Sequence, residues 1–65
     1  MTLEEIKAKV AKIAENIADD EKCHGMEDEL HLEFIQFVAD SRQGTVLGDM
    51  AREILKTDDL NFCRW

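Results

Sequence analysis

The chain has 65 residues, of which 15 are acidic and eight are basic, so its net charge at neutral pH is −7. This length allows one domain, near the lower limit for a self-sufficient hydrophobic core, and argues against a second domain. Because no apolar run of 18 residues occurs, the sequence offers no transmembrane helix. We therefore expect a single helical domain over residues 1–65 that gains stability by binding to itself or to a partner.

The compartment follows from the N-terminus and the cysteines. The first ten residues, MTLEEIKAKV, are amphipathic and lack the apolar core of a secretion signal. Two cysteines, Cys23 and Cys63, are few for a small secreted protein, which usually carries several disulfides. We expect a cytoplasmic protein in which both cysteines are free thiols.

The first predicted helix begins after Thr2. Thr2 and Glu5 have the spacing of a capping box, in which each side chain satisfies a backbone N–H of the first turn. One apolar stripe then predicts a helix that runs to about Ala18. This stripe is compatible with packing in a small bundle. Because it covers about two and a half heptads, it is also compatible with a short coiled coil. The residues of the stripe are Leu3, Ile6, Val10, Ile13 and Ile17.

The second helix is predicted from about Met26 to Asp40. The polar segment from Asp19 to Gly25 is expected to connect the first two helices, because it closes with a glycine. Apolar residues cover most of the circumference of the second helix, so we expect it to be the central element, buried on several sides. Its polar residues fall on a band about 60° wide: Glu29, Glu33, Gln36 and Asp40.

The third helix is predicted from Thr45, a suitable N-cap, to about Lys56. Gly48 lies inside this helix, where glycine costs about 1 kcal/mol relative to alanine. Such a glycine indicates a close contact with a neighbouring backbone or a bulky ring. We expect the ring of Phe34 or Phe37 to make that contact.

The C-terminal segment combines another cap, Thr57, with the apolar residues Leu60, Phe62 and Trp65. An aromatic end left in water would promote aggregation, so Phe62 and Trp65 are expected to cover the bundle or a neighbouring subunit. No alternating β-branched run indicates a strand. The predicted fold is all-α: a three-helix bundle with a short C-terminal helical turn, associated into an oligomer.

The acidic excess lies wholly between Asp19 and Asp40, where eight acidic residues accompany one lysine. Since nucleic acid is bound through basic side chains, it is a poor partner, and a basic protein surface is a better one. A solvated connection and the first turn of a helix also explain these acids. An alternative function is mimicry of nucleic-acid charge, which would block a host nucleic-acid-binding protein. The residues that would carry it are Asp19, Asp20, Glu21 and Glu33.

His31 lies opposite the polar band of the second helix, so we expect it to be buried or at an interface. Glu27 and Asp28 precede it by four and three residues, which places both carboxylates one turn away. This spacing matches half of a carboxylate–histidine metal site, which a symmetric dimer would complete as an alternative function. The simpler interpretation is a hydrogen-bonded core or interface histidine, with no metal and no cofactor.

Other chemistry has little support. Ser41, the only serine, has no histidine nearby in the sequence, and no phosphate-binding glycine loop occurs. We therefore predict that the protein is not an enzyme. Zinc binding is also disfavoured, because the four available ligands lack the paired spacing of structural zinc sites. Those ligands are Cys23, His24, His31 and Cys63.

The segments CHGMEDELHLEFIQFVAD and ILKTDDLNFCRW resemble small uncharacterised proteins encoded by bacteriophages and prophages. Those proteins pair an H-x-M-E-D-x-L segment with a terminal T-x-x-L/I-x-F-x-R-W. The resemblance covers about the C-terminal two-thirds of the chain. It implies an all-helical fold and a phage or bacterial cytoplasmic setting, but it transfers no activity.

The predicted function is therefore a non-enzymatic, acidic protein–protein interaction module that self-associates through the second helix or the aromatic tail. Its partner would be a second copy or a protein with a basic surface. The residues expected at its interaction sites are Asp19, Asp20, Glu21, Glu27, Asp28, His31, Phe62 and Trp65.

Overall fold

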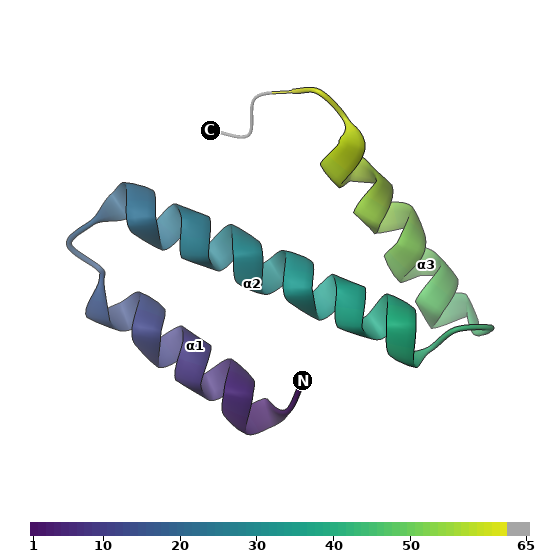
Figure 1. Cartoon of the computed structure of the whole chain (residues 1–65), viewed down its shortest axis with the longest axis horizontal. Helices are drawn as coiled ribbons and strands as arrows, with labels where there is room; N and C mark the ends of the chain where they lie inside the picture. The colour runs from purple at the N-terminus through teal and green to yellow at the C-terminus, as the bar shows by residue number, and fades with distance from the viewer. Residues whose placement is uncertain (63–65) are drawn as a thin grey trace. The chain divides into compact units, whose positions relative to one another are not determined.

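The computed structural model describes residues 1–62, and within this range the chain is helical and contains no strand. Three α-helices, α1 (Leu3–Glu15), α2 (Asp20–Ser41) and α3 (Val46–Leu55), are followed by a 3-10 turn, η1 (Lys56–Asp59) (Figure 1). The all-α prediction is confirmed. The chain divides into two compact units, Met1–Phe34 and Ile35–Trp65, and α2 belongs to both. The predictions for Cys63 and Trp65 fall outside the described residues.

The start of α1 is as predicted, but its end is not. The Thr2 hydroxyl accepts a hydrogen bond from the backbone N–H of Glu5 at 3.2 Å, so Thr2 is the N-cap. The helix ends before the predicted Ala18, because Asn16 closes it. The Asn16 side-chain amide donates to the Lys12 carbonyl at 2.8 Å, which satisfies one of the carbonyls left free at a helix end.

The predicted connection from Asp19 to Gly25 is wrong, because α2 already begins at Asp20. Asp19 supplies the missing start signal. Its carboxylate accepts the backbone N–H of Lys22 at 3.1 Å, and its carbonyl accepts that of Cys23 at 2.9 Å. Gly25 is therefore an ordinary helical residue, and a Cβ added there would meet nothing within 4 Å beyond the helix's own backbone.

In the first unit, α1 lies beside the first part of α2 (Figure 1). The apolar stripe of α1 is divided by this contact. Ile6 and Ile13 are partly buried, as are Met26 and Leu30 on α2. The other edge of the stripe remains exposed and consists of Leu3, Val10 and Ile17. We call these three residues the α1 edge.

In the second unit, small residues form the contact between helices. Gly44 adopts a φ of +81°, a left-handed conformation that glycine reaches without a clash, and turns the chain after α2. Thr45 caps α3 as predicted, because its hydroxyl accepts the backbone N–H of Gly48 at 3.1 Å. The buried residues are Ala39 of α2 and Gly48 and Ala51 of α3.

Gly48 is required by the backbone of the turn and not by an aromatic ring. A Cβ at Gly48 would lie 2.7 Å from the carbonyl carbon of Arg42, far inside van der Waals contact. Thr45 holds this carbonyl in place, since its backbone N–H and its hydroxyl donate to the oxygen at 3.1 and 2.6 Å. The prediction that Phe34 or Phe37 rests against Gly48 is wrong, and the alternative of a close backbone is correct.

The prediction that the second helix is buried on several sides is also wrong. Ala39 is the one buried residue of α2, and the large apolar residues Leu32, Phe34 and Phe37 are exposed. A helix that is apolar around most of its circumference needs neighbours on several sides. Residues 1–62 of one copy supply two further α-helices, and these leave Leu32, Phe34 and Phe37 of α2 exposed.

The C-terminal turn is present as η1, directly after α3. Thr57 does not cap it, because the Thr57 hydroxyl donates to the Ile54 carbonyl at 2.8 Å and no side chain caps η1. Phe62 follows η1 and is exposed, so the expected cover of the bundle by this ring is incomplete.

Candidate functional site

The acidic residues at the start of α2 have a local structural role. Asp19 is hydrogen-bonded to the first turn, and Asp20 and Glu21 lie within that turn. All three are exposed. Negative side chains at this end of a helix are stabilised by the helix dipole. Their position is therefore explained without a ligand.

His31 is exposed in the chain, so the expectation of burial is wrong. Glu27 and Asp28 are exposed as well. Among residues 1–62, no group of three or more His, Cys, Asp or Glu side chains could hold a metal ion. The placement of His31 at an interface between two copies stays a prediction.

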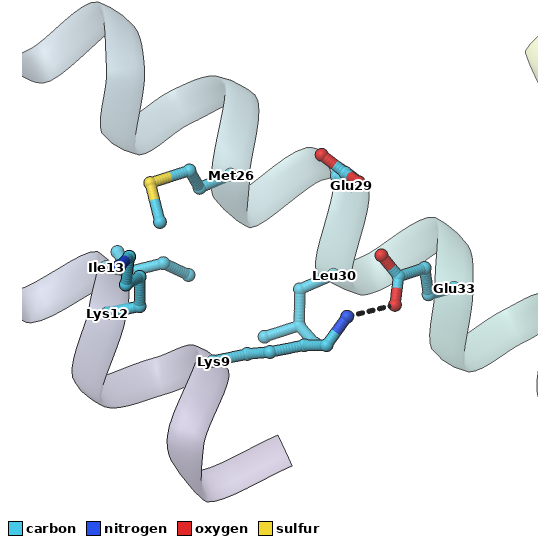
Figure 2. A pocket seen from close by; sticks show the side chains of 7 residues that line it. All are labelled: Lys9, Lys12, Ile13, Met26, Glu29, Leu30 and Glu33. Atoms are coloured by element: carbon cyan, nitrogen blue, oxygen red, sulfur yellow. Dashed lines mark hydrogen bonds and ion pairs between the residues drawn. The ribbon is translucent and has the colours of Figure 1, made fainter. Parts of the chain in front are cut away.

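An ion pair between Lys9 and Glu33 joins α1 to α2. Lys9 Nζ lies 2.5 Å from Glu33 Oε2, and Figure 2 marks this contact. The hydrogen bond to Glu33 raises the pKa of Lys9 above its ordinary value of 10.5, against a smaller opposing effect of desolvation. The sequence analysis placed Glu33 on a solvated band. Its spacing from Met26 and Leu30 would have indicated that it borders the side of α2 that faces α1.

A shallow hollow of about 140 Å³ lies between α1 and α2 in the first unit. Met26 and Leu30 point from α2 toward α1, and Leu30 lies beside the ion pair (Figure 2). Pockets that bind small molecules usually measure about 300–1,000 Å³. This hollow is therefore too small for a typical ligand. It is lined by Lys9, Lys12, Ile13, Met26, Glu29, Leu30 and Glu33.

Cys23 is a partly buried free thiol. Its sulfur lies 3.0 Å from the carbonyl oxygen of Asn16 and 3.4 Å from that of Ile13, where α1 ends. Both carbonyls also accept a backbone N–H, that of Asn16 from Asp19 at 2.9 Å and that of Ile13 from Asn16 at 3.0 Å, so the thiol is an additional donor at the end of α1. The geometry gives Cys23 a structural role in joining α1 to α2.

A concentrated apolar surface of the second unit lies on α3. Four large side chains fall within an arc of about 100° around the helix. They are Val46, Leu47, Met50 and Ile54, which are 74, 54, 57 and 52% exposed. We call these four residues the α3 outer face. Leu60 and Phe62 of the same unit are exposed as well.

The contacts that position α3 lie on its other faces. Gly48 and Ala51 are buried, and the Arg52 guanidinium donates to the carbonyl oxygen of Ala39 at 3.0 Å. Arg52 also pairs with Asp49 at 3.0 Å, within α3 itself. Because these contacts fix the rotation of the helix, the α3 outer face projects away from α2.

No protein family, no curated protein and no solved structure matches the chain. The resemblance to small phage proteins therefore rests on two sequence segments alone. Within residues 1–62, no helix is both long enough and apolar enough to cross a membrane.

Proposed function

We propose that the chain is a non-enzymatic protein interaction module that associates with a second copy of itself. One observation carries the proposal. Among residues 1–62, the buried apolar core consists of two alanines, Ala39 and Ala51, whereas twelve large apolar residues are exposed. Apolar surface concentrated in this way is typical of protein interaction sites.

The energetics favour association. Full burial of a large apolar side chain stabilises by about 1.5–3 kcal/mol. Because the residues of the α3 outer face are somewhat more than half exposed, covering all four contributes on the order of 5 kcal/mol per copy. Two copies together gain on the order of 10 kcal/mol, against a cost of association of about 4–15 kcal/mol. This balance indicates a weak and reversible dimer.

Analytical ultracentrifugation tests the proposal. The weight-average mass of the purified chain should rise from 7.5 kDa toward twice that value between about 5 and about 500 µM. Circular dichroism over the same range should show helicity that increases with association. A helical chain that stays at the monomer mass at the highest concentration would show that the proposal is wrong.

A further inference from the structure

We infer that two copies associate through the α3 outer face, with Met50 at the centre of the contact. The inference rests on the proposed self-association and assigns it to one surface, whose occupant is the same surface of a second copy. Exposed apolar side chains also occur on α1 and α2. The choice of α3 follows from packing, spacing and charge.

The packing of the second unit prevents the α3 outer face from turning inward. The Arg42 carbonyl occupies the space in which a side chain at position 48 would lie, so that side of α3 accepts only glycine. Ala51 is buried one turn further along, and the Arg52–Ala39 hydrogen bond fixes the same rotation. The four residues of the α3 outer face therefore lie away from the side of α3 that packs against α2. They can be covered only from outside the helix pair.

The α1 edge is a weaker candidate. Its residues lie seven positions apart, in a single row along a stripe whose inner half already contacts α2. Lys7 lies beside this row, about 40° from Leu3 around the helix. Its aliphatic stem can cover apolar neighbours while its charge stays in water. On α3, by contrast, four large side chains lie within about three turns.

Charge also favours α3. Two copies repel one another along Asp19 to Asp40, which carries the whole net charge of −7. The charged residues of α3 and Lys56 directly after it form neighbouring pairs of opposite sign, Asp49 with Arg52 at 3.0 Å and Glu53 with Lys56 at 2.6 Å, and the acidic residues Asp58 and Asp59 follow only in η1. A second copy therefore meets little uncompensated charge at the α3 outer face.

The size of the surface matches a weak homodimer. The α3 outer face presents on the order of 300 Å² of apolar surface per copy. Two such surfaces fall below the roughly 1,200 Å² of total area at which stable interfaces begin. Homodimers are mostly twofold symmetric, so each copy contributes the same patch. Met50 lies near the middle of α3, and an antiparallel arrangement about it places Val46 of one copy near Ile54 of the other.

Two matched lysine substitutions test the inference. Met50 and Val10 are 57 and 54% exposed, and each lies near the middle of its helix. Met50→Lys should weaken dimerisation at least about tenfold in the ultracentrifuge, whereas Val10→Lys should change it less than about twofold. Equal effects, or a larger effect of Val10→Lys, overturn the inference while leaving self-association intact. A monomeric wild-type chain overturns the proposed function as well.

Cross-linking tests the central position of Met50 without adding a charge. In a chain with Cys23→Ser and Cys63→Ser, Met50→Cys should form a disulfide-linked dimer under mild oxidation. The matched variant Val10→Cys should stay unlinked at the same protein concentration. Preferential linking through position 10 overturns the inference, as does a lack of linking through position 50 in a chain that the ultracentrifuge shows to be dimeric.

Discussion

The Arg52 guanidinium in α3 donates a hydrogen bond to the backbone carbonyl of Ala39, which lies 3.0 Å away in the last turn of α2. Carbonyls in the last turn of a helix lack partners within the helix, and a cation is favourable there. The last turn of α2 contains no basic residue of its own. Arg52 thus supplies from the next helix the charge that the end of α2 lacks.

Replacement of this arginine should destabilise the fold. Arg52→Met keeps most of the aliphatic stem but loses the hydrogen bond to Ala39, at a cost of about 1 kcal/mol. The thermal midpoint, measured by circular dichroism at fixed protein concentration, should fall by about 4–8 °C. Lys56→Met is the control, since its partner Glu53 is equally exposed on the surface and such pairs contribute little. Equal shifts in the two variants would contradict a capping role for Arg52.

Gly48→Ala should be among the most damaging single substitutions. The added Cβ overlaps the Arg42 carbonyl, and because this is backbone held by Thr45 it cannot move aside as a flexible side chain would. Overpacking of this kind costs about 1–3 kcal/mol. Urea unfolding monitored by circular dichroism measures the loss. A variant as stable as the wild type would show that the turn relaxes freely.

Gly25→Ala should have the opposite effect. Gly25 lies inside α2, and nothing beyond the helix's own backbone lies within 4 Å of an added Cβ. Alanine in a helix interior is more favourable than glycine by about 0.5–1 kcal/mol, partly because it restricts the unfolded chain. The midpoint of urea unfolding should therefore rise. A fall would indicate that residues 19–25 form a connection rather than the first turns of α2.

The Lys9–Glu33 pair makes the fold sensitive to high pH. Its hydrogen bond raises the pKa of Lys9 above 10.5, so the folded chain holds this proton more tightly than the unfolded chain does. The stabilisation is fully present below the unfolded pKa and is lost as the pH rises through the folded pKa. Unfolding curves of wild type and Lys9→Met should differ at pH 8 and converge once the pH has passed the folded pKa of Lys9. A difference that persists there would show that Lys9 acts through packing alone.

The effect of ionic strength on binding distinguishes a second copy of the chain from a partner with a basic surface. Two copies carry the same net charge of −7, so added salt screens their repulsion and should strengthen dimerisation. Binding to a basic protein surface should weaken under the same conditions. Ultracentrifugation at about 50 and about 500 mM sodium chloride measures the first effect. A dimer that dissociates as salt is added would indicate an ionic contact in place of the apolar one.

Local signals were sufficient to predict parts of the fold. Thr2 and Thr45 were identified as caps because the hydrogen bond that each accepts lies within a single turn. The predicted start of the second helix, at about Met26, is too late, because Gly25 has the form of a loop residue and Asp19 that of a cap. Both residues carry plausible signals, and only the backbone shows that the carboxylate of Asp19 starts the helix.

The candidate interface on α3 could not be predicted from the sequence, because helical periodicity does not show which apolar residues of a helix face its neighbour. The apolar repeat of α3 includes Ala51, which is buried, and Met50, which is exposed. Which of them faces α2 is decided by Gly44, whose turn brings the Arg42 carbonyl against Gly48. Similarly, the apolar surroundings of His31 predicted burial, but burial also requires a neighbouring helix, and one copy of the chain leaves His31 exposed.

Gly44 in the α2–α3 turn and Gly48 inside α3 set the direction in which α3 leaves α2. Gly44 and Gly48 are tied to one backbone geometry, whereas the residues of the α3 outer face are each more than half exposed. Substitutions on this face therefore leave the contacts of the turn in place. The α2–α3 hairpin is in this respect a scaffold for redesign, in which the exposed side chains at four positions can be varied while the turn that sets the direction of α3 is kept.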